Sequence, residues 1–456
     1  MQNRKSPRCK IANQNVAKSQ IADQYAAIMS AANYRPRLLD SLLAAKLRAT
    51  GGVLLCGARA AGKTTTALHR AASSVRLDRS ENLRQLAALA PAQLLAGDAP
   101  RLVDEWQLAP SLWNAARCEI DERGAKGQFI FTGSAAPDDD ASLHSGAGRF
   151  ARLVLRPMTL GESGDSTGSV SFAALFGDTP TPTAGSVPNG GVAGFGGADV
   201  PRYAELIVRG GWPALRELSA DDAHSALRDY VDNVAEVDLR NLASPPDPQR
   251  MAALLRAISR NVSSEASLEK LAREADFGNG APAAQTVRKY LDQLARCFVL
   301  EELPAWNTTI RSSIRLRVKP KWHFCDPSLA CAALGVTAGG LLNDLETMGL
   351  LFESMAVRDL RSLADAADAK VFHYRDSSDL EIDAIVERRD GAWLAFEIKL
   401  GGEKAIETAV ASFAKLRNRL LPEKLANLRA CCVLTAGETS FTRPDGIHVI
   451  ALGHLN

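Results

Sequence analysis

The sequence predicts a multidomain α/β protein whose first sheet is mainly parallel. The chain has 456 residues, about three times a typical domain length. In its first third, short apolar runs alternate with helical patterns, which is typical of parallel strands joined by helices. A second mixture of helices and strands follows near the C-terminus, so we expect a second, independent α/β domain there.

The first domain begins with a predicted helix, Leu38 to Leu47, in which apolar residues recur at helical spacing. Gly51 and Gly52 end that helix, and the apolar run Val53–Cys56 follows as a buried strand. Further strands are predicted at Leu102–Val103 and at Phe129–Phe131. These strands are separated by helical stretches, and the sheet that they form is therefore expected to be parallel.

Composition sets few limits on function. Hydrophobic residues make up 46% and charged residues 23%, with a formal net charge of +2, as in ordinary globular proteins. The eight cysteines include no CxxC pair, so neither a zinc site nor a disulfide framework is expected. No eighteen apolar residues run together and the leader lacks a signal-length apolar core, so we expect a soluble, cytoplasmic protein without a membrane partner.

A glycine-rich loop follows the first strand and carries the pattern Gly-x-x-x-x-Gly-Lys-Thr, which predicts a P-loop for Mg²⁺-bound ATP. Backbone N–H groups bind phosphates only where the chain approaches closely, and glycine allows that approach. Lys63 is expected to reach the β- and γ-phosphates, and the Thr64 hydroxyl to bind Mg²⁺. The predicted nucleotide-binding residues of this loop are Gly57, Ala58, Arg59, Ala60, Ala61, Gly62, Lys63, Thr64 and Thr65.

Two carboxylates follow the second strand. Asp104 is expected to hold Mg²⁺ through water, and Glu105 to act as the base that polarises the attacking water. The alternative is a solvated acidic turn. The third strand ends in Thr132-Gly133-Ser134, where Ser134 would lie beside the γ-phosphate and sense hydrolysis, or would be an ordinary polar strand end.

The middle of the chain predicts a flexible segment and then a helical module. Between Gly161 and Val200 there is no Lys or Arg, and small residues dominate, which favours an insertion or linker. A long helix is expected over Asp221–Leu242, after the turn Gly210-Gly211-Trp212-Pro213. Three further helices and a strand pair suggest a winged helix, or a three-helix packing unit that binds no DNA. The helices are predicted at Met251–Arg260, Ser267–Ala275 and Thr286–Phe298, the last presenting Gln285, Thr286, Arg288, Lys289 and Gln293 outward.

A basic run follows the third of these helices. It would contact phosphates or form a solvated hairpin edge. Its members are Arg311, Arg315, Arg317, Lys319 and Lys321.

The C-terminal segment carries a carboxylate and lysine set on predicted strands. Glu397 and Lys399 alternate on one strand and therefore share a face, and an antiparallel neighbour would bring Asp383 beside them. Together with Glu353 on a predicted helix, Leu341 to Leu363, these side chains match the needs of metal-assisted phosphodiester cleavage, with Asp383 and Glu397 as metal ligands. A fold that only binds its ligand is the alternative. The strands are predicted at Lys370–Tyr374, Glu381–Glu387, Trp393–Ile398 and Ala430–Leu434.

In sequence order, these motifs resemble prokaryotic AAA-like P-loop ATPases with a C-terminal domain of undefined function and a restriction-endonuclease-like (PD-(D/E)XK) fold. The resemblance covers Tyr34 to the C-terminus. It implies that Arg149, or secondly Arg152, reaches the γ-phosphate of a neighbouring subunit in a homo-oligomer; a surface salt bridge is the alternative for both. The motifs that carry it are Tyr34-x-x-Arg37, Gly62-Lys63-Thr64-Thr65, Asp104-Glu105-Trp106-Gln107, Thr132-Gly133-Ser134, Gly148-Arg149, Pro157 with Glu162, and Gly210-Gly211-Trp212-Pro213.

We therefore expect an ATPase that acts on DNA through a winged-helix-like module and a nuclease-like domain. The rival hypothesis is an ATP-gated regulator or scaffold, without nuclease activity, that binds DNA or protein. The expected divisions are a polar extension at 1–33, an AAA-like P-loop domain at 34–162, an insertion or linker at 163–200, a helical connector or lid at 201–248, a winged-helix-like module at 249–306 and a restriction-endonuclease-like domain at 307–456.

Overall fold

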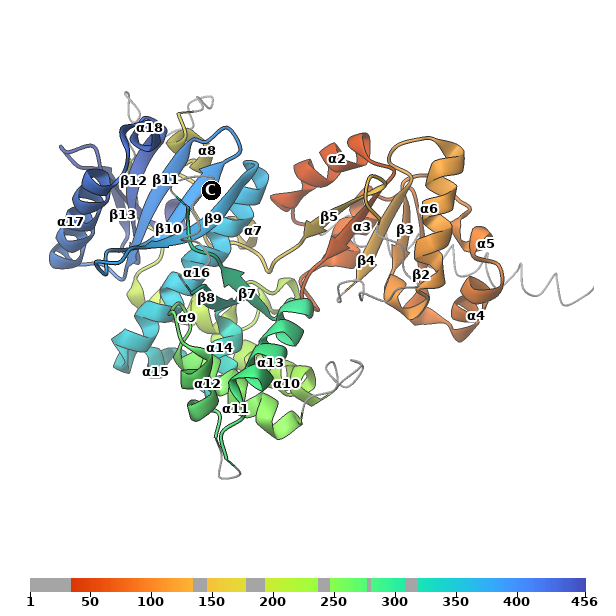
Figure 1. Cartoon of the computed structure of the whole chain (residues 1–456), viewed down its shortest axis with the longest axis horizontal. Helices are drawn as coiled ribbons and strands as arrows, with labels where there is room; N and C mark the ends of the chain where they lie inside the picture. The colour runs from red at the N-terminus through yellow and green to blue at the C-terminus, as the bar shows by residue number, and fades with distance from the viewer. Residues whose placement is uncertain (1–33, 134–145, 178–192, 237–246, 277–279, 308–318) are drawn as a thin grey trace, which may run out of the picture. The chain divides into compact units, whose positions relative to one another are not determined.

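A computed structural model describes residues 34–133, 146–177, 193–236, 247–276, 280–307 and 319–456 (Figure 1). The chain divides into two compact units, which we call the N-terminal unit, Met1–Leu155, and the C-terminal unit, Arg156–Asn456. Each unit is described separately below.

The N-terminal unit contains a five-stranded sheet in the order β2-β3-β4-β1-β5. Every neighbouring pair is parallel, so the carboxyl ends of all five strands lie along one edge. The expected strands are present, whereas β2 and β5 were not predicted because their residues are mostly only half-buried. The strands are β1 Gly52–Cys56, β2 Ser73–Arg76, β3 Arg101–Asp104, β4 Phe129–Gly133 and β5 Phe150–Val154.

Five α-helices accompany this sheet in the described part of the unit. One core lies between the sheet and helix α2, where Leu43 and Leu47 pack with Val53, Leu55 and Ile130. The helices are α2 Leu39–Ala49, α3 Lys63–Arg70, α4 Glu81–Leu89, α5 Pro91–Leu95 and α6 Ser111–Arg123 (Figure 1).

The C-terminal unit contains a seven-stranded mixed sheet in the order β6-β13-β14-β12-β11-β10-β9. Strand β10 pairs antiparallel with both of its neighbours, and β11 pairs parallel with β12. Helices α16 Leu345–Ala366, α17 Glu403–Arg419 and α18 Pro422–Leu425 accompany the sheet. Its strands are β6 Ala193–Phe195, β9 Ala369–Arg375, β10 Glu381–Arg388, β11 Trp393–Lys399, β12 Leu428–Thr435, β13 Thr439–Thr442 and β14 His448–Ala451.

Both described ends of the expected linker, 163–200, belong to the fold of this unit, which corrects that expectation. Strand β6 pairs with β13 at the sheet edge, and Phe172 in α8 Phe172–Leu175 stacks on the ring of Phe396. The composition suggested a linker, but burying the apolar side chains of Val170, Phe172 and Leu175 favours packing. Residues 178–192 lie outside the described part.

The middle of the C-terminal unit is helical, with a two-stranded antiparallel sheet formed by β7 Leu300–Leu303 and β8 Lys321–Phe324. Gln293 was expected to face outward but is only 8% exposed, because it lies on the packed face of α13 with Tyr290 and Leu294. Arg311, Arg315 and Arg317 lie outside the described residues. The helices are α7 Leu160–Ser163, α9 Val200–Arg209, α10 Ala220–Glu236, α11 Pro248–Arg260, α12 Leu268–Glu274, α13 Ala284–Arg296, α14 Ser328–Leu334 and α15 Ala338–Asn343.

The Gly210-Gly211-Trp212-Pro213 turn is a packing element. A Cβ atom on Gly211 would lie 2.1 Å from the Met158 carbonyl oxygen, so only glycine fits there without movement. The Gly211 N–H donates to buried Asp326 at 2.9 Å, and Trp212 Nε1 donates to Ser328 Oγ at 3.0 Å. The turn therefore fixes α9 against the start of α14.

Candidate functional site

The P-loop connects β1 to α3, as the glycine-rich pattern predicts. Gly57 and Gly62 have φ angles of +146° and +99°, which side-chain-bearing residues rarely adopt. A Cβ atom on Gly57 would lie 2.1 Å from the Leu155 carbonyl oxygen. Arg37 Nη1 donates to the Ala61 carbonyl oxygen at 3.0 Å, so the arginine of the Tyr-x-x-Arg motif holds the backbone of the P-loop in place.

Lys63 is folded back onto its own loop. Its Nζ atom donates to the carbonyl oxygens of Gly57 at 2.9 Å and Ala58 at 2.8 Å. Burial lowers the pKa of Lys63, while the nearby Glu105 and Asp104 carboxylates raise it. The ammonium group is therefore held at the loop, where a phosphate would offer it a stronger acceptor than a carbonyl oxygen.

Asp104 lies where three elements of the N-terminal unit meet. Its carboxylate, 1% exposed, accepts a hydrogen bond from Thr64 Oγ1 at 2.8 Å and another from Thr132 Oγ1 on β4. Arg76 Nε on β2 lies 3.3 Å from its second oxygen. The P-loop, the acidic strand end and the third predicted strand thus converge on one carboxylate.

Glu105 follows Asp104 with a left-handed φ angle of +56°. Its carboxylate accepts a hydrogen bond from Gln107, and burial raises its pKa above the ordinary value. A higher pKa suits a carboxylate that takes up a proton. Trp106 and Gln107 pack against Gly133, where a Cβ atom would lie 2.7 Å from Gln107 Oε1.

The remaining predicted residues of this site are placed differently. Arg149 Nε lies 2.8 Å from Asp121 Oδ1 on α6, an exposed pair. Arg152 hydrogen-bonds to the Cys56 thiol and lowers its pKa, although burial raises that pKa more. Arg59, Ala60 and Thr65 are exposed beside the loop, and Ser134 lies outside the described residues.

Arg76, which lies beside Asp104, was not predicted as a site residue. The signal that would have indicated its role is a basic residue on a strand next to a strand that ends in an acidic residue.

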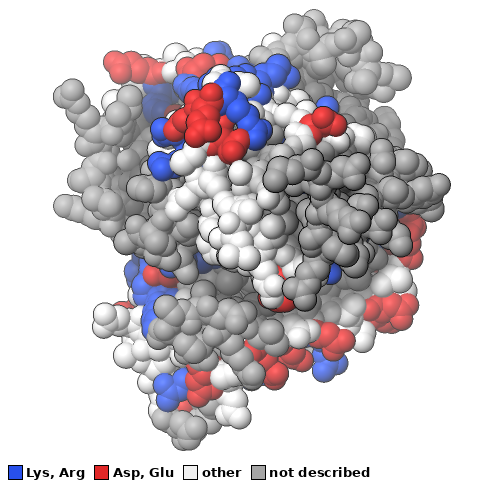
Figure 2. All heavy atoms as spheres, turned by 90° about the vertical axis from the view of Figure 1, so that its right-hand side faces the viewer, with Lys and Arg blue, Asp and Glu red and all other residues white. Residues whose placement is uncertain are grey.

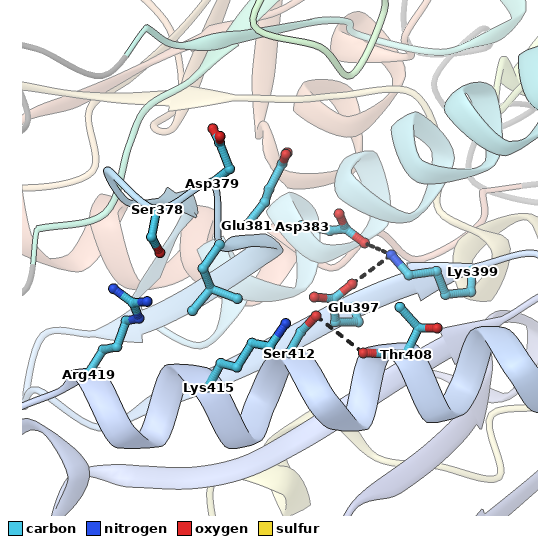
Figure 3. A pocket seen from close by; sticks show the side chains of 11 residues that line it. Ser378, Asp379, Glu381, Asp383, Glu397, Lys399, Thr408, Ser412, Lys415 and Arg419 are labelled. Atoms are coloured by element: carbon cyan, nitrogen blue, oxygen red, sulfur yellow. Dashed lines mark hydrogen bonds and ion pairs between the residues drawn. The ribbon is translucent and has the colours of Figure 1, made fainter.

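The C-terminal unit brings Asp383, Glu397 and Lys399 together, as strand alternation predicts. Lys399 Nζ lies 2.8 Å from Asp383 Oδ2 and 2.6 Å from Glu397 Oε2 (Figure 3). The Ile398 N–H also donates to Asp383 at 2.7 Å. One ammonium group therefore joins the carboxylates of two adjacent antiparallel strands.

A second lysine, Lys321 on β8, belongs to the same cluster. Its Nζ atom lies 2.9 Å from Glu353 on α16 and 2.6 Å from Glu381 on β10, and its side chain is 2% exposed. This placement excludes both the solvated hairpin edge and the phosphate contact expected for Lys321. A lysine directly before the bulky ring side chains Trp322, His323 and Phe324 was the available signal, because a buried ammonium group needs carboxylate partners.

Burial and crowding shift the titration of this cluster. Burial raises the pKa of Glu353 to about 7 and that of Glu397 to about 8, and the charge of Asp383 adds to both shifts. The pKa of Asp383 is lowered because Lys399 and Lys321 outweigh its desolvation. The cluster thus holds more carboxylates than cations, which is a surplus that a bound cation would neutralise.

The residues present can be compared with the needs of Mg²⁺. Over the described residues, no three His, Cys, Asp or Glu side chains are grouped so that they could hold a metal ion. Mg²⁺ commonly takes one or two carboxylates and completes its shell with water and phosphate oxygens. Asp383 with Glu397, and the Thr64 hydroxyl with Asp104 behind it, fit Mg²⁺ in the chemistry of their oxygen atoms.

The cysteines and the longest helices bear on the expectations about disulfides and membranes. All cysteines in the described ranges are free thiols. None of the helices that the structure describes is long and apolar enough to cross a membrane.

Comparison with known families divides the chain into three matched segments. Residues 50–163 match the family described as AAA domain. Residues 200–339 and 348–455 match two families described as domains of unknown function, DUF8612 and DUF4143.

Similar whole proteins come from mycobacteria and archaea. Uncharacterized proteins Rv2008c of Mycobacterium tuberculosis and Mb2031c of Mycobacterium bovis are each 26% identical over 401 residues, covering 87% of this chain and 78% of theirs. The Walker-type ATPase PABY2304 of Pyrococcus abyssi is 14% identical with a TM-score of 0.36, over 66% of this chain and 99% of its own. The ORC1 protein of Aeropyrum pernix in complex with DNA is also 14% identical, with a TM-score of 0.25, over 65% of this chain and 90% of its own.

The parallel sheet, the P-loop geometry and the AAA-domain match of residues 50–163 together support an AAA-like ATPase.

Proposed function

We propose that the chain binds and hydrolyses Mg²⁺-bound ATP at the P-loop and that this nucleotide cycle controls an action of the C-terminal unit on DNA. The convergence of Thr64 and Thr132 on Asp104 carries the first part of the proposal. These hydrogen bonds join the P-loop, which follows β1, to the ends of β3 and β4, and a P-loop ATPase uses these three places to hold and sense a triphosphate. Mg²⁺, when bound, would neutralise charge on the phosphates.

Each residue of this site has a chemical task. Lys63 would exchange the carbonyl oxygens of Gly57 and Ala58 for phosphate oxygens, which are stronger acceptors. Asp104 would keep the Thr64 hydroxyl oriented toward the metal site. Glu105, whose pKa is raised by burial, would take the proton of the attacking water. Arg149 stays our candidate arginine finger toward a second copy of the chain.

ATP binding and turnover by three variants test this proposal. Lys63→Ala is expected to lose nucleotide binding, because the phosphates lose their buried ammonium partner. Glu105→Gln is expected to bind ATP but to hydrolyse it about 10²- to 10⁴-fold more slowly, the usual effect of losing a general base. Arg123→Gln, which removes a surface pair with Glu119 and a cation–π contact with Phe129 but no residue of the site, serves as the control. Wild-type affinity and rate in Lys63→Ala would contradict the proposal.

A second candidate function is metal-dependent cleavage of a phosphodiester in a restriction-endonuclease-like domain. The supporting observation is that Lys399 lies between the carboxylates of Asp383 and Glu397, with Glu353 held nearby through Lys321. Asp383 and Glu397 would hold the metal ion, and Lys399 would move from the carboxylates to the attacking water or the phosphate.

Cleavage of supercoiled plasmid with Mg²⁺ or Mn²⁺, with and without ATP, tests this second function. Nicking by the wild type that is lost in Asp383→Ala and in Lys399→Ala would support it. A plasmid left intact by the wild type under every condition would instead favour the rival, an ATP-gated regulator or scaffold that binds DNA or protein.

A winged-helix-like arrangement of α11, α12, α13 and the β7–β8 pair would provide DNA contacts. Gln285, Arg288 and Lys289 are exposed on α13, although Arg288 also pairs with Asp292 and Glu302. On the face drawn in Figure 2, Lys and Arg lie among Asp and Glu rather than in one broad basic patch. On α13 itself, Arg288 and Lys289 are the exposed cations that would contact DNA phosphates.

A further inference from the structure

A cavity of about 430 Å³ opens beside Asp383 in the C-terminal unit, and its two sides carry opposite charge. One side is acidic and comes from β10, β11 and the turn before β10. The other side is helix α17 (Figure 3). The acidic side consists of Asp379, Glu381, Asp383 and Glu397, with Lys399 between the last two.

The helical side is a single stripe of polar residues, Thr408, Ser412, Lys415 and Arg419. Their spacing of four, three and four residues places them on one face of α17. Both hydroxyls bond to backbone oxygens of their own helix: Thr408 Oγ1 donates to Lys404 O at 2.8 Å, and Ser412 Oγ to Thr408 O at 3.3 Å. The charged ligand-binding groups of the stripe are therefore Lys415 and Arg419.

These two cations are available to a ligand. Lys415 makes no hydrogen bond or ion pair with any residue in the described ranges. Among the residues that the structure describes, Arg419 makes one ion pair, with Asp376 Oδ2 at 3.2 Å, and about half of its side chain is exposed. Its guanidinium group can bind an anion with its remaining N–H groups.

Opposite charges on facing walls restrict the class of ligand. A simple anion would meet more acidic groups than cations on the acidic side, where Lys399 is the one lysine among the lining residues, and a simple cation would meet only cations among the charged groups of the stripe. A phosphodiester backbone that carries a divalent cation presents both charges, the cation to the carboxylates and the neighbouring phosphates to Lys415 and Arg419. The cavity volume also falls in the roughly 300–1,000 Å³ range of ligand sites.

We propose that Lys415 and Arg419 form a phosphate-binding stripe on α17 that holds a nucleic-acid backbone along the carboxylate wall. The inference rests on the second proposed function, because it names the side chains that would hold the substrate of that site. It also separates the roles of the two walls: α17 supplies affinity for the backbone, and the carboxylates supply the metal site.

Binding of a fluorescein-labelled DNA duplex by the full chain, measured by fluorescence anisotropy in Ca²⁺ across a salt series, tests the stripe. The double variant Lys415→Gln, Arg419→Gln should bind about tenfold or more weakly. Its plot of log affinity against log salt should lose about 2 units of slope, because two phosphate contacts are gone. The control Lys370→Gln, Arg389→Gln removes one exposed lysine and one exposed arginine at the other end of β9 and β10. It should match the wild type.

The inference is overturned if the stripe variant keeps wild-type affinity and slope, or if the wild type does not bind the duplex. Plasmid cleavage separates this result from the second proposed function. Stripe-dependent binding without cleavage under any metal condition would sustain the stripe and overturn the nuclease proposal.

Discussion

Lys321 is one buried ammonium group shared by Glu353 and Glu381, and its removal would leave Glu353 without a cation and Glu381 with only its 4.0 Å pair to Arg375. Breaking a buried pair from one side costs about 3–5 kcal/mol. Lys321→Met should therefore destabilise the C-terminal unit by about 3 kcal/mol. Adding Glu353→Gln should restore part of this loss, because the most buried unpaired charge disappears. Urea unfolding of the single and double variants measures both effects, and an unaltered midpoint in Lys321→Met would contradict the assignment.

Glu397 should make the C-terminal unit less stable as pH rises. Its folded pKa of about 8 lies above the ordinary 4.5, so between these values the folded chain holds a proton that the unfolded chain has released. Stability is then highest below about pH 4.5 and falls as pH rises toward about 8. Glu397→Gln cannot titrate and should lose less stability over this window. Thermal unfolding at about pH 5 and about pH 8 measures the difference, with Glu403→Gln, an exposed carboxylate on α17, as the control.

At the scale of elements, the turn between α9 and α10 should be sensitive to a single methyl group. A Cβ atom on Gly211 would meet a backbone oxygen at 2.1 Å, so Gly211→Ala should destabilise the C-terminal unit by about 3 kcal/mol. Gly339→Ala in α15 is the matched control, since nothing lies within 4 Å of its added Cβ atom and alanine favours helix by up to about 1 kcal/mol. Equal unfolding midpoints for the two variants would show that the turn can relax.

The elements predicted well from the sequence are those whose residues show a regular pattern over a short stretch of chain. Alternation along β11 placed Glu397 and Lys399 on one face, and a neighbouring antiparallel strand placed Asp383 beside them. Lys321 could not be assigned this way, because its partners Glu353 and Glu381 lie 32 and 60 residues further along the chain. Strand β6 was missed for the same reason: three residues show no pattern, and only pairing with β13 makes them a strand.

At the scale of the whole molecule, Mg²⁺-bound ATP should stabilise the N-terminal unit selectively. A ligand at 100 times its dissociation constant adds about 2.7 kcal/mol to the state that binds it. Hydrogen exchange should therefore slow in β1, the P-loop, β3 and β4, and less in β9 to β11. Lys63→Ala should remove the effect. Equal protection of both units at saturating nucleotide would contradict a site confined to the P-loop.

The position of Lys321 also has a consequence for inheritance. The lysine lies in the segment that matches one family, 200–339, whereas Glu353 and Glu381 lie in the segment that matches another, 348–455. Recombination that exchanged only the second segment would replace both carboxylate partners of the buried Lys321 ammonium group. The two segments are therefore expected to be inherited as one unit. If they are not, substitutions at positions 321, 353 and 381 are expected to be correlated.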